Sequence, residues 1–280
     1  MSKSRAKFGA GRATPVASAS DLAQIARDHA FVALAYGESP FLAGCLASLH
    51  SQTIASRTII ATSTPSDHVS RAAADFGFAL VVNPTRAGIA ADWNFGLRAA
   101  KARFVTLAHQ DDLYAPDFLA ETLASFRRCV GAICFTGYEE VDDDGYPTSS
   151  KISRAKHLIE ALTLGGARKA KGLRLRAYLS FGNPLPCSSV TYDLQRLGGF
   201  EFSDDFASNL DWDAWWRLMV AGETFVRAPA RLVGRRHNAL TETSRLLRDG
   251  VRRTEDLAMF RRAWPAPLSD ILAAAYRAGY

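Results

Sequence analysis

The chain has 280 residues, of which 48% are hydrophobic and 22% are charged, a balance typical of a globular protein rather than a disordered or fibrous one. It has no run of about 18 apolar residues and no apolar stretch near its N-terminus, so the sequence predicts neither a transmembrane helix nor a signal peptide. We therefore expect a cytoplasmic protein whose four cysteines, none in C-x-x-C spacing, are reduced.

Strands and helices are predicted to alternate in the first half of the chain. Residues 1–28 lack periodicity and are expected to form a flexible tail. From residue 29 to about 137 the alternation predicts an α/β domain with a mostly parallel sheet, helices on both faces and ligands at the carboxyl ends of the strands. The expected strands are 30–35, 58–61, 78–82, 104–108 and 132–136, and the expected helices are 40–49, 69–76, 89–100 and 116–128.

The second half is less regular. A strand is expected at 188–192, an amphipathic helix at 210–220, short strands at 223–226 and 231–236, and a C-terminal helical region at 241–280. We expect one domain over 29–265, in which a nucleotide-binding half at 29–137 is followed by a smaller mixed half at 138–240.

The segment 151–176 is strongly basic. It contains eight Lys or Arg residues and one acid, Glu160, which exceeds the net charge of +6 of the whole chain. Such a concentration suggests an anionic partner, and a solvated helix face without a partner is an equal alternative. With Gly165, Gly166 and Gly172 as hinges, we expect a mobile flap that contacts an anionic acceptor or an anionic membrane surface.

Two carboxylates and a histidine end the strand expected at 104–108. The sequence there is His109-Gln110-Asp111-Asp112, and adjacent acids at a strand end are unfavourable unless a cation or several donors compensate. A divalent metal site and a simple helix cap are equally compatible with the residues alone.

Two further groups of residues could carry chemistry. Asp211 lies near the start of the Trp-rich helix, where the helix dipole favours its ionised form and where it could act as a general base or only as a cap. Asp213 has Arg217 at i+4 and is expected to pair with it on the surface. His237 follows two arginines, which favour the neutral form that binds metals.

In order and spacing these segments resemble family 2 glycosyltransferases, which have the GT-A fold. The resemblance covers about residues 30–260. Residues 31–38 resemble the first strand and its nucleotide-binding loop, residues 88–94 the G-x-x-x-x-x-N helix, and His109-Gln110-Asp111-Asp112 a subgroup form of the D-x-D-D motif. Gly198-Gly199-Phe200 and Asp211 resemble the acceptor-side G-G-F and the E-D pair, with Leu210 in place of the Glu.

The resemblance implies a role for each matching residue. Asp211 would be the general base, and Asp111 and His237 would bind Mg²⁺ or Mn²⁺. The nucleotide-sugar donor would contact Ala35, Tyr36, Glu38, Thr64, Asp92, Asn94, His109, Gln110 and Asp112. The implied reaction is an inverting transfer of a single sugar to a glycan or lipid-linked acceptor, in the synthesis of cell-surface polysaccharide or glycolipid.

Two other functions stay open at this stage. A sugar-nucleotide nucleotidyltransferase shares the α/β core but would need a Gly-rich basic loop after the first strand, where Tyr36-Gly37-Glu38 stands instead. A non-catalytic module that binds nucleotide or RNA would need exposed aromatic residues among the basic ones of 151–176. No nucleic-acid partner is expected.

Overall fold

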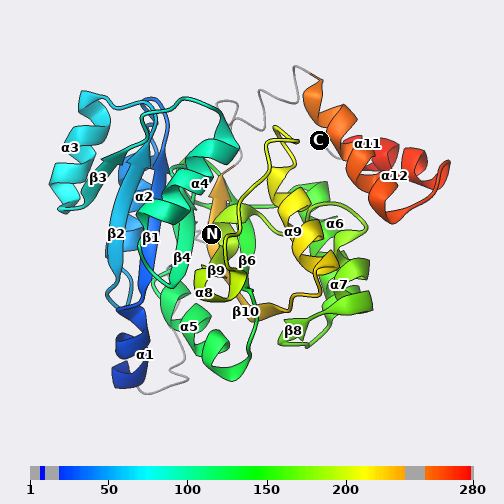
Figure 1. The fold of residues 1–280 in the computed structure, drawn as a ribbon, viewed down its shortest axis with the longest axis horizontal. Coiled ribbons are helices and arrows are strands. Elements are labelled where there is room, and N and C mark those ends of the chain that lie inside the picture. Colours follow the sequence, from blue (N-terminus) through cyan, green and yellow to red (C-terminus); the bar gives the residue numbers. More distant parts are fainter. Residues whose placement is uncertain (1–6, 10–18, 237–249, 279–280) are drawn as a thin grey trace, which may run out of the picture.

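A computed structural model describes residues 7–9, 19–236 and 250–278 (Figure 1). Its centre is strand β1 (His29–Ala35), which pairs in parallel with β2 (Arg57–Thr62) and with β4 (Phe104–His109). Successive residues of β1 alternate between two cores: Val32 packs in one and Phe31 in the other. Because both faces of the strand are buried, its sequence is almost continuously apolar, as is usual for a parallel sheet.

The sheet is mostly parallel on one side and mixed on the other. Strand β9 (Val190–Asp193) runs antiparallel between β4 and β6 (Ile133–Val141), and β10 (Phe225–Arg236) runs parallel to β6. The order across the sheet is β3-β2-β1-β4-β9-β6-β10-β5, where β3 is Ala79–Val82 and β5 is Leu113–Tyr114. Two short strands, β7 (Pro147–Thr148) and β8 (Lys169–Ala170), pair with β6 and β10.

Helices cover both faces, as predicted. On one face lie α1 (Ala19–Ala26), α2 (Leu42–His50), α3 (Asp67–Phe76) and α5 (Phe118–Arg128). The other face carries α4 (Ile89–Ala99), α6 (Lys151–Leu164), α7 (Gly172–Leu179), α9 (Leu210–Val220), α11 (Val251–Ala263) and α12 (Leu268–Arg277), and the short α8 (Leu194–Leu197) follows β9. None of the helices in the described part of the chain is long and apolar enough to cross a membrane.

Part of the expected N-terminal tail belongs to the fold. Helix α1 buries Leu22 and Ala26 against the core that contains Phe31. The backbone N–H of Phe8 donates a hydrogen bond to the carbonyl of Gly145 (3.0 Å), and the Phe8 ring packs on Gly234, where a Cβ would approach it to 2.9 Å. The prediction of a tail is therefore wrong for residues 7–9 and 19–26.

The strongly basic segment is not a separate flap. It forms α6, β8 and α7, whose side chains Leu164, Leu175 and Tyr178 are buried in the main core. The single acid Glu160 forms an ion pair with Arg227 of β10 (2.6 Å between Oε1 and Nη2). The segment is thus a packed layer of the domain, and its apolar residues at helical spacing explain the difference from the prediction.

The two short strands expected near the C-terminus are one strand, β10. Its pairing with β6 shifts register between Ala228 and Arg231 and again before Val233. Pro229 lies within the first irregularity, and a proline inside a sheet is confined to such positions because it donates no hydrogen bond. The continuous strand carries the chain on to Arg235 and Arg236.

Folding stability should depend on the protonation of His29 in β1. Burial lowers the pKa of His29 from 6.5 to about 3, and its ring nitrogens bond to the hydroxyls of Ser56 (2.7 Å) and Thr106 (3.0 Å). Below pH ~6.5 the unfolded chain binds a proton at His29 and the folded chain does not. The contribution of His29 to the free energy of unfolding is therefore full above that pH and falls by about 1.4 kcal/mol per pH unit below it. Urea unfolding between pH 7.5 and 5 should show a shallower pH dependence for His29→Gln; equal slopes would contradict the assignment.

Candidate functional site

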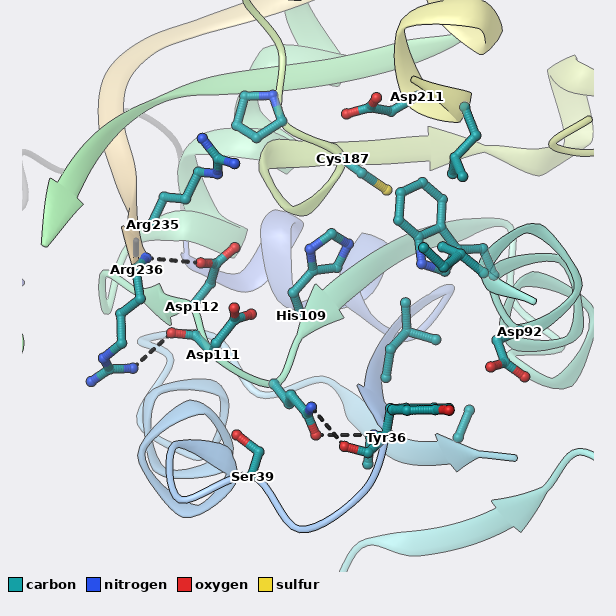
Figure 2. Close-up of a pocket in the computed structure, with 18 of the residues that line it drawn as sticks. Tyr36, Ser39, Asp92, His109, Asp111, Asp112, Cys187, Asp211, Arg235 and Arg236 are labelled. Carbon is teal, nitrogen blue, oxygen red and sulfur yellow. Dashed lines mark hydrogen bonds between the residues drawn. The ribbon is translucent and has the colours of Figure 1, made fainter. Parts of the chain in front are cut away.

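A cavity of about 920 Å³ lies at the carboxyl ends of β1, β2 and β4. Residues of the first half line one side of it, and residues of β10, α6, α9 and α11 line the other. In an α/β sheet this edge is where ligands bind, because the loops that follow the strands can vary without disturbing the sheet. Figure 2 shows the central part of the cavity, with His109, Asp111 and Asp112 on one side and Asp211 on the other.

His109, Asp111 and Asp112 form a compact group of metal-ligating side chains. One ligand atom from each residue lies within 4.8 Å of those of the other two. The Nε2 atom of His109 is buried and has no hydrogen-bond partner among the described residues. An imidazole nitrogen beside two carboxylates is a donor set that suits a divalent cation, and the unpartnered nitrogen fits a ligand role.

Burial and mutual charge shape the ionisation of this group. Burial and the neighbouring charge of Asp111 raise the pKa of Asp112 to about 7, and burial lowers the pKa of His109. The backbone N–H of Arg236 donates to Oδ1 of Asp112 (3.2 Å). A neutral imidazole is the form that binds metals, and a bound cation would favour the ionised form of Asp112.

The end of β10 brings two arginines next to the group formed by His109, Asp111 and Asp112. Arg236 donates from Nη1 to the carbonyl of Asp111 (2.7 Å), and its guanidinium lies 4.7 Å from the centre of the Phe41 ring. Arg235 projects into the cavity beside Asp112 (Figure 2) and forms no ion pair with any described residue. His237, the second predicted metal ligand, lies outside the described residues.

The nucleotide side of the site is built around the loop after β1. Ala35, Tyr36 and Glu38 line the cavity, as do His109 and Gln110. The side-chain amide of Gln110 donates to the carbonyl of Tyr36 (2.9 Å) and accepts from its N–H (3.0 Å), which fixes this loop. Thr64 does not line the cavity: its hydroxyl accepts from the N–H of Gly37 (2.7 Å) and supports the loop from behind.

Helix α4 contributes one lining carboxylate and one structural amide. Asp92 lines the cavity and accepts hydrogen bonds from the Ser63 hydroxyl (2.8 Å) and the Asn83 amide (2.9 Å). Asn94 does not line it, because its side-chain amide bonds to both backbone groups of Phe202 (2.8 and 2.9 Å). Asn94 therefore attaches the segment before α9 to the first half of the domain.

The first turn of α9 separates two aspartates with different surroundings. Asp211 lines the cavity and faces the His109, Asp111 and Asp112 group across it (Figure 2). Asp213 does not line the cavity, is only 1% exposed, and forms ion pairs with Arg217 (2.7 Å) and Arg262 (2.6 Å). The predicted pair with Arg217 is present, although its carboxylate is buried rather than on the surface.

Helix α11 holds the segment that leads into α9. The carboxylate of Glu255 accepts from three successive backbone N–H groups, those of Ala207 (2.7 Å), Ser208 (2.8 Å) and Asn209 (2.9 Å). The Asn209 amide also donates to Asp256 (2.8 Å). Ala207 and Ser208 precede the helix and Asn209 is its N-cap, so these contacts fix the approach of the chain to α9 and with it the position of Asp211.

The cavity includes residues that the sequence did not nominate. Two of them, Ser63 and Arg235, lie at or next to strand ends, a signal that could have identified them. The guanidinium of Arg86 lies 5.8 Å from the centre of the Tyr36 ring. Glu255 could not have been identified, because only the folded chain brings α11 to α9. The other lining residues that were missed include Ser39, Phe41, Trp93, Cys187 and Arg252, whereas Lys156 belongs to the segment 151–176 that was expected to contact the acceptor.

Three solved structures of similar fold have low sequence identity to this chain. S. aureus TarS in complex with UDP-GlcNAc has a TM-score of 0.59 and 12% identity, covering 89% of this chain and 71% of that one. The mannosyltransferase PcManGT from Pyrobaculum calidifontis, in complex with GDP-Man and Mn²⁺, has 0.59 and 18%, covering 89% and 70%. Glucosyl-3-phosphoglycerate synthase from Mycobacterium tuberculosis, with Mn²⁺, UDP and glucosyl-3-phosphoglycerate, has 0.58 and 17%, covering 90% and 87%.

These likenesses confirm the predicted GT-A fold. Comparison with curated protein sequences finds no match. Comparison with models of protein families finds that of "Glycosyl transferase family 2" over residues 31–187, more than half of the chain. The chain therefore belongs to glycosyl transferase family 2.

Proposed function

We propose that the protein transfers a single sugar from a nucleotide-sugar donor to an acceptor hydroxyl, with inversion at the anomeric carbon and with Mg²⁺ or Mn²⁺ as cofactor. The observation that carries this proposal is the placement of Asp211 opposite His109, Asp111 and Asp112 in one cavity (Figure 2). Proteins of similar fold have been crystallised with UDP-GlcNAc, with GDP-Man and Mn²⁺, and with UDP and Mn²⁺, which supports this class of donor.

The metal would be held by Asp111 with His109 and Asp112, and His237 is a further proposed ligand. When bound, the cation would neutralise negative charge on the leaving diphosphate. Arg235 would contact the same phosphates, since its guanidinium points into the cavity next to this group. We interpret His109, which stands in place of the motif's first Asp, as the mark of a subgroup within the family.

Asp211 would act as the general base. Its carboxylate accepts the proton of the acceptor hydroxyl while that oxygen attacks the anomeric carbon from the face opposite the diphosphate. The bond from the anomeric carbon to the phosphate oxygen breaks, and the nucleoside diphosphate leaves with the electron pair. A single carboxylate on this face suffices for an inverting displacement.

The rest of the donor would lie along the loop after β1 and the start of α4. Tyr36 presents a ring that is 58% exposed at the cavity edge, and Ala35, Glu38 and Asp92 line the same side. Gln110 and Thr64 would act by holding this loop, and Asn94 by holding Phe202. These roles differ from the direct contacts implied by the family resemblance.

The family match favours sugar transfer over both alternatives, a nucleotidyltransferase and a non-catalytic binding module. The sequence also led us to propose a glycan or lipid-linked acceptor, a hexose as the sugar, a cytoplasmic location, and a role in the synthesis of cell-surface polysaccharide or glycolipid. No contact with nucleic acid is part of this proposal.

The direct test is nucleotide release. The protein is incubated with a panel of sugar nucleotides and Mn²⁺ or Mg²⁺, and nucleoside diphosphate and glycosylated products are followed by mass spectrometry. We expect slow, metal-dependent release from one donor even without acceptor, and the Asp111→Ala variant should release none. Absence of release from every donor, with the protein folded, would contradict the proposal.

Glu255 should position the proposed base without contacting substrate. Glu255→Gln removes the negative charge that holds three N–H groups, so Asp211 should move relative to the donor. A displacement of about 1 Å costs up to about 10²-fold in rate. We expect kcat to fall while the donor Kd stays close to that of the wild type. Glu223→Gln, which alters the partner of Arg196 (2.8 Å), is the control and should leave kcat unchanged. Loss of donor affinity in Glu255→Gln would indicate a general structural role instead.

A further inference from the structure

Helix α6 has two opposite faces with different surroundings. Ile152 and Ile159 pack against the main core, and Lys156 lines the cavity. Leu158 and Leu162 lie one turn apart on the other face and are 59% and 77% exposed. Arg154, one turn before Leu158, is exposed on the same face, because residues four apart share one side of a helix.

The adjacent helix α7 also carries exposed apolar and basic side chains. Leu173 in its first turn is 86% exposed, the highest value among the large hydrophobic side chains of the described residues. Helices α6 and α7 lie side by side on the side of the sheet away from α3, and α11 and α12 lie beyond them (Figure 1). We call this the α6/α7 surface, and its members are Lys151, Arg154, Leu158, Leu162, Lys169, Lys171, Leu173 and Arg174.

The cations of the α6/α7 surface are not neutralised within the part of the chain that the structure describes. The five Lys and Arg residues are exposed, and none of them forms an ion pair with another described residue. The nearby acid Glu160 is occupied by Arg227. Exposed leucines interspersed with unpaired cations are the composition of helices that lie in the interface of an anionic membrane.

We propose that the α6/α7 surface binds the anionic lipid face of a membrane. The leucines would enter the headgroup region while the lysines and arginines contact phosphate groups. A second copy of the chain is disfavoured as the occupant, because its contact would bring two sets of five like charges together. RNA is disfavoured because the members of this surface include no aromatic side chain on which bases could stack.

The position of this surface would serve the proposed transfer. Lys156 lines the cavity from the opposite side of α6, so about one helix diameter, ~10 Å, separates the membrane face from the cavity. An acceptor carried on a lipid could then reach Asp211 from the membrane. This step rests on the proposed function, whereas membrane binding by the α6/α7 surface does not.

The test is co-sedimentation of the full chain with vesicles. We expect binding to phosphatidylcholine–phosphatidylglycerol vesicles that weakens with added salt, and little binding to phosphatidylcholine alone. The double variant Lys171→Glu with Arg174→Glu should lower the partition coefficient about 30-fold or more. Each basic residue near an anionic membrane contributes ~1 kcal/mol, and every 1.4 kcal/mol corresponds to about a tenfold change in the partition coefficient. The control pair is Arg27→Glu, after α1, with Arg71→Glu, on α3. It makes the same charge change away from the α6/α7 surface and should have a much smaller effect.

A second pair of variants tests the leucines. Leu162→Glu should weaken binding about tenfold, because it removes apolar area that the membrane would bury and adds a charge that the anionic lipids repel. Val130→Glu is the matched control, since Val130 is also 77% exposed but lies after α5, and should change binding about twofold at most.

Several results would overturn the proposal. These are equal binding to neutral vesicles, equal weakening by either control, and a dimer in gel filtration that Leu162→Glu dissociates. Donor hydrolysis in solution should be unchanged in all these variants. Failure of membrane binding and failure of sugar transfer would therefore appear in different measurements.

Discussion

Asp211→Asn is expected to lower kcat by about 10² to 10⁴ while leaving donor affinity unchanged. An amide keeps the shape of the side chain but cannot accept a proton from the acceptor hydroxyl. The Oδ1 atom that accepts from the N–H of Trp212 (2.8 Å) is an oxygen in both residues, so the helix start should be preserved. The measurement is steady-state transfer together with calorimetry of donor binding.

Asp213→Asn provides the matched comparison two residues further on. Its carboxylate is buried between Arg217 and Arg262, so the amide should destabilise the fold by about 1–3 kcal/mol, an amount limited by the partial exposure of both arginines. Urea unfolding measures this loss, and kcat of the folded fraction should stay near that of the wild type. If instead Asp211→Asn turns over normally and Asp213→Asn is inactive with donor affinity intact, the base is Asp213.

Asp111→Asn and His109→Ala should each weaken Mn²⁺ binding at least about 10-fold, since changes even in the outer shell of metal sites cost 10–100-fold. The two side chains contribute different donor atoms to one group, and His109 Nε2 has no other described partner. Electron paramagnetic resonance of free Mn²⁺, with nucleoside diphosphate present, reports binding independently of activity.

Removal of the metal with EDTA should likewise suppress nucleotide release, and added Mn²⁺ should restore it. Asp204→Asn, an exposed acid on the segment before α9, is the control and should bind Mn²⁺ like the wild type. Wild-type Mn²⁺ affinity in both His109→Ala and Asp111→Asn would show that this group is not the metal site.

The sequence predicted the sheet well where strands are buried on both faces. Strand β4 and the acids that follow it were identified because an apolar run ends abruptly in polar residues. Helix α1 was missed because it has only eight residues, too few to form a stable helix alone, and is stabilised by packing on α5 and β1. The break expected within β10 reflects Pro229, whose effect the parallel neighbour β6 absorbs as a bulge.

The site was predicted in part, and one physical cause explains the residues whose contacts in the structure differ from those expected from the sequence. Asn94 and Thr64 stand at motif positions, yet their side chains bond to the backbone of Phe202 and Gly37. Spacing in a sequence does not show which backbone groups remain without partners after folding, and those groups decide how a polar side chain is used. Glu255 was not predicted for the same reason, because its partners are three N–H groups 46 to 48 residues earlier.

The contacts of α11 with the start of α9 also matter for attempts to engineer specificity. Glu255 and Asp256 hold the residues before α9, and Arg262 neutralises Asp213 inside it. A chimera that took α9 and the residues before it from another family member but kept α11 of this chain would lose all of these contacts at once. Exchanges between members of the family should therefore replace α9 and α11 together.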